Sequence, residues 1–153
     1  MKHQVHVVHE QPCDQSIGDL PALAQAVLVH EKASAGSLSI VLTSEEKQRD
    51  LNRRFAQIDQ STDVLAFGDG SPDPESGSIY YGDVTIALPI AVRQAKQAGH
   101  SLATELALLT VHGVLHLLGH DHYETAERSR MRRIQAKILR QFGHSIKSLE
   151  NNE

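Results

Sequence analysis

A long segment with almost no charge constrains this sequence most. Residues 103–118 carry one charged side chain, Glu105, and their apolar residues occur all round a helical wheel. A helix that is apolar on every side lies inside a core and not at the surface. We therefore expect a buried central helix that the rest of the chain must cover.

The flanking segments predict the elements that cover this helix. Apolar alternation and β-branched residues predict strands over 3–10, 37–42, 63–67 and 78–88. Helical spacing predicts helices over 20–35, from about 44 to 55, and over 89–98, 102–118 and 124–142. Asp19 and Ser101 are expected N-caps, and Thr43 with Glu46 an expected capping box.

The order of these elements predicts an α+β fold. We expect a single-domain layered fold over residues 1–153, in which helices pack on a mixed sheet of about four strands. No internal repeat or long linker divides the chain, and 40% hydrophobic with 22% charged residues is an ordinary globular composition.

The sequence predicts a cytoplasmic protein. No stretch approaches the roughly 20 apolar residues that cross a bilayer, and the first ten residues lack the pattern of a secretory signal. The single cysteine, Cys13, cannot form an internal disulfide. The net charge of -4 gives no general attraction to nucleic acid, so such a partner would need a local basic patch.

Two histidines interrupt the apolar helix. His112 and His116 are four residues apart, so both imidazoles point the same way, about 6 Å apart along the axis. Their Leu, Val and Ala neighbours have no side-chain groups that could form hydrogen bonds with the ring nitrogens. Gly119 favours a sharp turn at the helix end, which lets His122 reach the same point. We predict that the three histidines bind zinc at the end of the central helix.

Three histidine ligands suit hydrolysis. Open catalytic zinc sites keep a fourth position for water, and the cation lowers the pKa of that water to about 7. The alternative is that the histidines are hydrogen-bonded core residues that fall at ligand spacing by chance. The same spacing occurs in metzincin proteases, but these carry a glutamate base directly after the first histidine, where this chain has Gly113. Peptide hydrolysis is therefore the less favoured alternative.

The segment His112 to His122, HGVLHLLGHDH, resembles the signature of the YbeY endoribonucleases. The resemblance continues upstream through Leu51-Asn52 and residues 62–67 and 82–86, in the family's order. It implies a bacterial zinc-dependent endoribonuclease that cuts single-stranded RNA in ribosomal RNA maturation and ribosome quality control. Zinc would be held by His112, His116 and His122, and the partner would be an rRNA precursor or a ribosomal subunit, with no DNA or membrane.

The sequence departs from the family pattern at two places. Ala56-Gln57 stands where the family usually has Arg-Gly, so an arginine expected to hold phosphate is missing. We predict that Arg53 and Arg54, one turn earlier, contact RNA instead. His120 stands where the family commonly has tyrosine.

The general base is less clearly indicated. Asp121 either orients a ligand histidine or takes the proton from water, and we name it as the candidate catalytic residue. The last predicted helix is basic, which usually indicates a solvated face and alternatively an RNA contact; its cationic residues are Arg128, Arg130, Arg132, Arg133, Lys137 and Arg140. A metallohydrolase acting on another bond and a non-catalytic, zinc-stabilised ribosome-assembly factor remain alternative functions.

Overall fold

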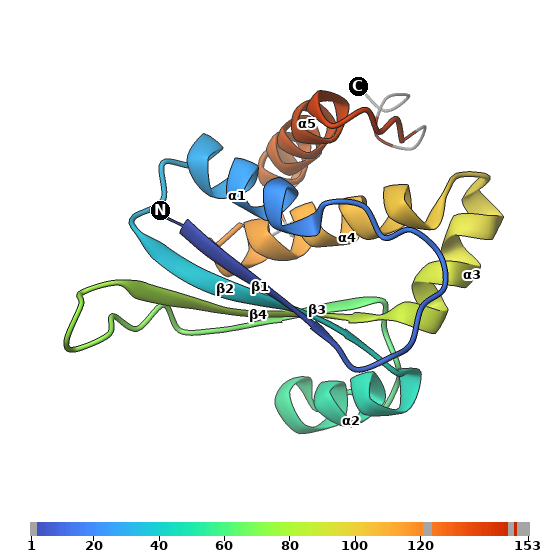
Figure 1. The fold of residues 1–153 in the computed structure, drawn as a ribbon, viewed down its shortest axis with the longest axis horizontal. Helices are drawn as coiled ribbons and strands as arrows, with labels where there is room; N and C mark the ends of the chain where they lie inside the picture. Colours follow the sequence, from blue (N-terminus) through green and yellow to red (C-terminus); the bar gives the residue numbers. More distant parts are fainter. Residues whose placement is uncertain (1–2, 121–123, 147–148, 150–153) are drawn as a thin grey trace.

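The computed structural model describes residues 3–120, 124–146 and 149 and forms an α+β fold (Figure 1). Its elements in chain order are β1 (His3–His9), α1 (Leu20–His30), β2 (Gly36–Thr43), α2 (Glu45–Ala56), β3 (Val64–Phe67), β4 (Ile79–Ala87), α3 (Leu88–Ala98), α4 (Leu102–Leu117) and α5 (Thr125–Gln141). The predicted fold class and the mixed sheet of four strands are confirmed. No helix within these described residues is long and apolar enough to cross a membrane.

The sheet has the strand order β1-β2-β4-β3. β1, β2 and β4 are parallel, whereas β3 pairs antiparallel with β4 and forms one edge. In Figure 1, α1, α4 and α5 lie on one face of the sheet and α2 lies on the other. The chain therefore forms three layers: α1, α4 and α5, then the sheet, then α2. β3 is the edge strand of the sheet beside α4.

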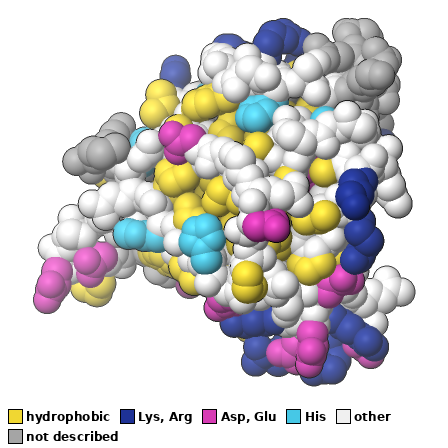
Figure 2. Space-filling model, turned by 45° about the vertical axis from the view of Figure 1, so that its right-hand side comes forward, with side chains coloured by type: hydrophobic (Ala, Val, Ile, Leu, Met, Phe, Trp, Pro, Cys, Tyr) yellow, Lys and Arg dark blue, Asp and Glu magenta, His cyan; other side chains and the backbone are white. Residues whose placement is uncertain are grey.

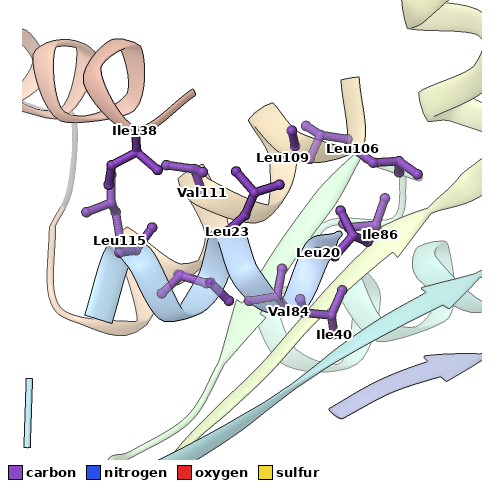
Figure 3. Packing of buried hydrophobic residues seen from close by; sticks show 14 of the residues in the cluster. Leu20, Leu23, Ile40, Val84, Ile86, Leu106, Leu109, Val111, Leu115 and Ile138 are labelled. Atoms are coloured by element: carbon purple, nitrogen blue, oxygen red, sulfur yellow. The ribbon is translucent and has the colours of Figure 1, made fainter. Parts of the chain in front are cut away.

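The core lies between the sheet and α4, as the apolar segment predicted. Leu106, Val111 and Leu115 of α4 are fully buried, and they pack with apolar residues of α1, β2, β4 and α5 (Figure 3). The one charged residue of this helix, Glu105, is 5% exposed, and its carboxylate lies 2.6 Å from His100 Nε2. Burial of each large apolar side chain contributes about 1.5–3 kcal/mol, so this helix organises the fold.

α4 packs closely against the sheet at Gly113. A Cβ atom at this position would lie 2.5 Å from Cγ1 of Val84 on β4 and 3.4 Å from Cγ2 of Val64 on β3. Real Cβ atoms do not tolerate a 2.5 Å contact, so any larger residue would push the helix off the strands. The close approach places the neighbouring residue, His112, beside β3.

The end of α1 and the start of α2 differ from the sequence expectations. The predicted end of α1 at residue 35 is wrong: the helix ends at His30, because Lys32 adopts a left-handed conformation (φ 55°) and Ala33 N–H donates to Leu28 O. The predicted capping box is also wrong. Ser44, and not Thr43, caps α2, and its hydroxyl accepts from the Lys47 N–H at 3.1 Å.

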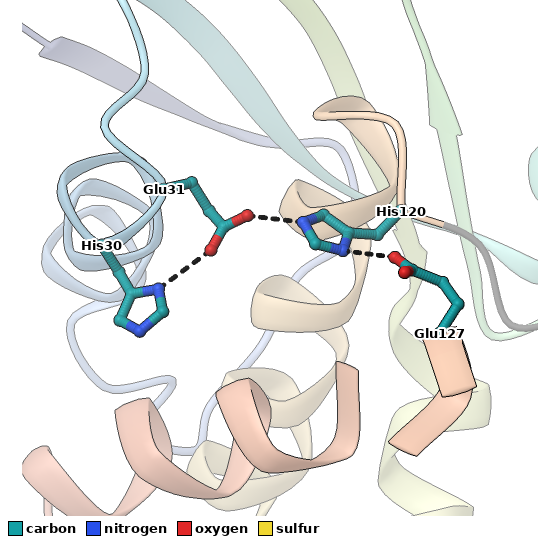
Figure 4. Close-up of polar contacts among 4 residues, drawn as sticks. All are labelled: His30, Glu31, His120 and Glu127. Carbon is teal, nitrogen blue, oxygen red and sulfur yellow. Dashed lines mark hydrogen bonds and ion pairs between the residues drawn. The ribbon is translucent and has the colours of Figure 1, made fainter. Parts of the chain in front are cut away.

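His120 ties three helices together after the end of α4 (Figure 4). Its Nδ1 lies 2.7 Å from Glu127 Oε1 on α5, and its Nε2 lies 2.5 Å from Oε1 of Glu31, which follows α1. The other oxygen of Glu31 lies 2.9 Å from His30 Nδ1. Burial raises the pKa of the Glu31 carboxyl, but the hydrogen bonds with His120 and His30 outweigh it and hold the pKa below its ordinary value. These contacts fix the position from which the chain continues towards residue 121.

We expect Gly113→Ala to destabilise the protein by about 1–3 kcal/mol, because the added methyl group overpacks the contact with Val84. The unfolding free energy in urea measures this loss. Val84→Ala opens the same space, so the double variant should lose less stability than the sum of the two single variants. Simple additivity would contradict the proposed contact.

We expect His120→Ala to cost about 2–3 kcal/mol of unfolding free energy, because two carboxylates lose a buried partner. His30→Ala removes the exposed end of the same network and should change stability by less than about 0.5 kcal/mol. Because folding lowers the pKa of Glu31, its stabilising effect is present above the unfolded pKa and fades as the pH falls through the folded pKa. Urea unfolding at neutral and acid pH measures both the difference between the two variants and its pH dependence. Equal losses in the two variants at neutral pH would contradict the role of His120, and a loss in His120→Ala that stays the same at acid pH would contradict the role of Glu31.

Candidate metal centre

His112 and His116 face each other on the last turns of α4. Their Nε2 atoms are 3.0 Å apart, and their ring centroids are 4.5 Å apart with an interplanar angle of 65°. Two bare lone pairs, or two N–H groups, would repel at this distance. The two nitrogens must therefore share either a proton or a cation.

Gln135 of α5 sets the orientation of the first ring. Its Oε1 lies 2.9 Å from His112 Nδ1, and its side chain is buried, with 5% of the residue exposed. An amide oxygen only accepts hydrogen bonds, so His112 Nδ1 carries the proton and Nε2 presents its lone pair towards His116. Metal-binding histidines are commonly held in this way by a second partner on the far ring nitrogen.

The histidine pair fits a zinc ion. Zinc binds histidine nitrogen at about 2.0–2.1 Å, so two nitrogens of a tetrahedral site lie roughly 3.3 Å apart. The observed 3.0 Å separation is close to that spacing. The predicted third ligand, His122, and the predicted catalytic residue, Asp121, lie outside the described residues. Within residues 3–120, 124–146 and 149, no group of three metal-ligating side chains occurs.

Two hollows meet at His112. One, of about 520 Å³, runs between β3 and α4 and is lined by residues 62–66, His112, Gly113 and His116. The other, of about 370 Å³, lies between α4 and α5 and is lined by Asp63, Val64, Leu108, Leu109, His112, Arg128, Met131, Arg132, Gln135 and Leu149. His112 is therefore open to ligands from both hollows, and His116 from the hollow beside β3.

Asp63 lines both hollows beside His112. Its Oδ1 accepts from the Val64 N–H at 2.8 Å and from the Thr62 hydroxyl at 3.4 Å, which holds the carboxylate at the start of β3. No sequence pattern predicted a role for Asp63 or Gln135. Gln135 carried a usable signal, since it is a polar residue within the apolar stripe formed by Met131 and Ile138.

The predicted RNA-binding residues Arg53 and Arg54 lie on α2, on the far face of the sheet from α4 (Figure 1). Both are exposed and pair with Asp50, at 2.5 Å from Arg53 and 3.2 Å from Arg54. Figure 2 shows basic and acidic side chains interleaved at the lower end of the molecule, where α2 lies. Neither arginine lines the two hollows at the histidines, so the structure does not bring these two predicted sites together.

The residues that replace the family's Arg-Gly lie at the end of α2. Ala56 is the last helical residue, and Gln57 follows in a left-handed conformation with φ 59°. Glycine adopts this conformation without strain, which explains a glycine at that position in the family pattern. Ala56 supplies no cation here.

Comparisons with known proteins identify the family. The family model for Endoribonuclease YbeY matches residues 4–143. The Endoribonuclease YbeY of Carboxydothermus hydrogenoformans is 43% identical over 130 residues, which cover 85% of this chain and 89% of that protein. The one from Nocardia farcinica is 39% identical over 154 residues, covering 94% of this chain and 82% of that protein.

A solved structure shares the fold. The solution structure of TM1509 from Thermotoga maritima superposes with a TM-score of 0.59 at 21% identity, covering 90% of this chain and 91% of that one. This likeness supports the fold alone, whereas the family model and the curated relatives carry the assignment. The chain therefore belongs to the YbeY family of endoribonucleases, which confirms the family and the hydrolase class predicted from its sequence.

Proposed function

We propose that this chain is a zinc-dependent endoribonuclease that cuts single-stranded RNA in the cytoplasm during ribosomal RNA maturation. One observation carries the metal part of the proposal: Nε2 of His112 and Nε2 of His116 are 3.0 Å apart, and Gln135 orients the His112 ring. Membership of the YbeY family supports RNA, as an rRNA precursor or a ribosomal subunit, as the partner.

The proposed ligands are His112, His116 and His122. Zinc, when bound, lowers the pKa of a coordinated water to about 7 and offsets the negative charge that develops on a phosphodiester during cleavage. Gln135 keeps His112 in the tautomer that offers Nε2. Asp121 is proposed to take the proton from the attacking water, and Arg53 and Arg54 are proposed to contact the RNA backbone.

Peptide hydrolysis is disfavoured by the contact at Gly113. A glutamate base directly after the first histidine would need a Cβ atom where Val84 Cγ1 leaves 2.5 Å. The close packing of α4 on β4 therefore leaves no room for the metzincin base. A non-catalytic assembly factor, in which zinc only stabilises the fold, is the second candidate, favoured by the loss of the family arginine at Ala56.

The experiment that tests the proposal combines metal content with RNA cleavage. We expect mass spectrometry of untagged protein to find about one zinc per chain, and we expect the protein to cut a single-stranded RNA in single-turnover assays. His116→Ala should lose both the zinc and the cleavage, because one ligand is gone. The exposed His30→Ala is the matched control and should keep both.

The outcomes separate the candidates. Zinc without cleavage in the wild-type protein would favour the assembly factor, and cleavage that persists in metal-free His116→Ala would contradict a catalytic metal. Absence of zinc and of any other transition metal would contradict the metal site itself.

We also expect Gln135→Leu to weaken zinc affinity about 10–100-fold, because His112 loses the partner that holds its ring and tautomer. Competition with a chromophoric chelator measures this affinity without relying on activity. Gln135→Glu keeps an acceptor oxygen and should retain affinity within a few-fold. Equal zinc affinity in the leucine variant would show that the Gln135 contact does not orient a ligand.

A further inference from the structure

One face of α5 carries a row of polar side chains that leads to the histidine pair. Arg128, Arg132 and Gln135 are spaced by four and three residues, so they lie on the same face of the helix. The hydrogen bond that His112 Nδ1 donates to Gln135 Oε1 fixes which face of α5 turns towards α4. Arg132 lies one turn before Gln135 and Arg128 two turns before it, both directed to the same side.

Both arginines line the hollow of about 370 Å³ that His112 also lines. Arg128 is exposed and Arg132 is half-buried, whereas Arg130, Arg133 and Lys137 fall on the opposite face of α5 and are exposed. The basic residues of this helix therefore fall into two groups on different faces. One group forms the solvated face that such a composition usually indicates, and the other faces the candidate metal centre.

The chemistry of the hollow suits one nucleotide of a strand. Leu108, Leu109 and Met131 give it apolar walls, which can receive the face of a base. Arginine presents a planar fork of N–H donors that matches the oxygens of a phosphate. Partial burial of Arg132 strengthens such a contact, because water screens the charge less there.

We infer that Arg128 and Arg132 hold a backbone phosphate of the RNA while the neighbouring base enters the hollow, which brings the strand to His112 and His116. This inference rests on the proposed ribonuclease function. It places the main cationic contact on α5, in a protein whose net charge is -4 and whose α2 ends in Ala56. The two arginines act as binding and positioning residues and take no part in bond cleavage.

Binding of a fluorescently labelled single-stranded RNA oligonucleotide, measured by anisotropy over a range of salt concentrations, tests the inference. Each lost phosphate contact lowers the slope of log affinity against log salt by about 0.7 for a single strand. We expect the Arg128→Ala/Arg132→Ala variant to lower the slope by about 1.4 and to weaken binding at least tenfold at low salt. Arg130→Ala/Arg133→Ala removes the same charge from the opposite face and should leave the slope nearly unchanged.

Two further variants sharpen the result. Arg132→Lys keeps the charge but loses the planar fork. Its salt slope should therefore equal that of the wild-type protein, while its affinity for RNA should be lower. Arg53→Ala/Arg54→Ala measures the contribution of α2 in the same assay. Urea unfolding and zinc content of each variant identify any effect that comes from loss of the fold or of the metal centre.

Three outcomes would overturn the inference. Equal slopes in the two α5 double variants would show that the face towards the hollow has no special role. A slope lost only in Arg53→Ala/Arg54→Ala would place the RNA on α2. In both of these cases, cleavage of RNA by the wild-type protein would leave the proposed function standing. If the wild-type protein neither binds nor cuts RNA, the proposed function fails and the inference fails with it.

Discussion

The close approach of α4 to the sheet at Gly113 is the contact on which the rest of this structure depends. It allows a helix that is apolar on nearly every side to pack directly against β4 and β3. The residues on either side of that contact, His112 and His116, then line the hollow beside the edge strand β3. The same packing that stabilises the core thus positions the candidate metal ligands.

α5 links this core to the site. Met131 and Ile138 bury one stripe of the helix, while Gln135 in the same stripe contacts His112 at 2.9 Å. The orientation that packs the helix also turns Arg128 and Arg132 towards the hollow at His112. Stability, ligand orientation and the inferred phosphate contact therefore all depend on how α5 docks against α4.

The sequence predicted the parts of the fold that local patterns determine. The nearly uncharged helix, the strands and the spacing of His112 and His116 follow from apolar periodicity and helix geometry, and the structure contains all of them. Local patterns failed where a left-handed residue or a neighbouring cap decided the boundary. α1 ended at His30, before the expected residue 35, because Lys32 is left-handed, and Ser44 replaced Thr43 as the cap of α2.

Contacts between distant elements were beyond sequence reasoning. The role of Gln135 depends on the docking of α5 against α4, and the location of Arg53 and Arg54 depends on which face of the sheet α2 covers. Both depend on tertiary packing, although the position of Gln135 within an apolar stripe is visible in the sequence. The resemblance of the histidine segment and the upstream motifs carried the family assignment, which the comparisons confirm over residues 4–143.

Anomalous diffraction at the zinc edge, from crystals grown with zinc, tests the central claim most directly. We predict a single strong peak about 2.0–2.1 Å from Nε2 of both His112 and His116, with His122 as the third protein ligand. Gln135 should remain on the far nitrogen of His112. A structure in which zinc lies elsewhere, while the two Nε2 atoms stay in direct contact with each other, would contradict the claim and leave the pair as a hydrogen-bonded part of the core.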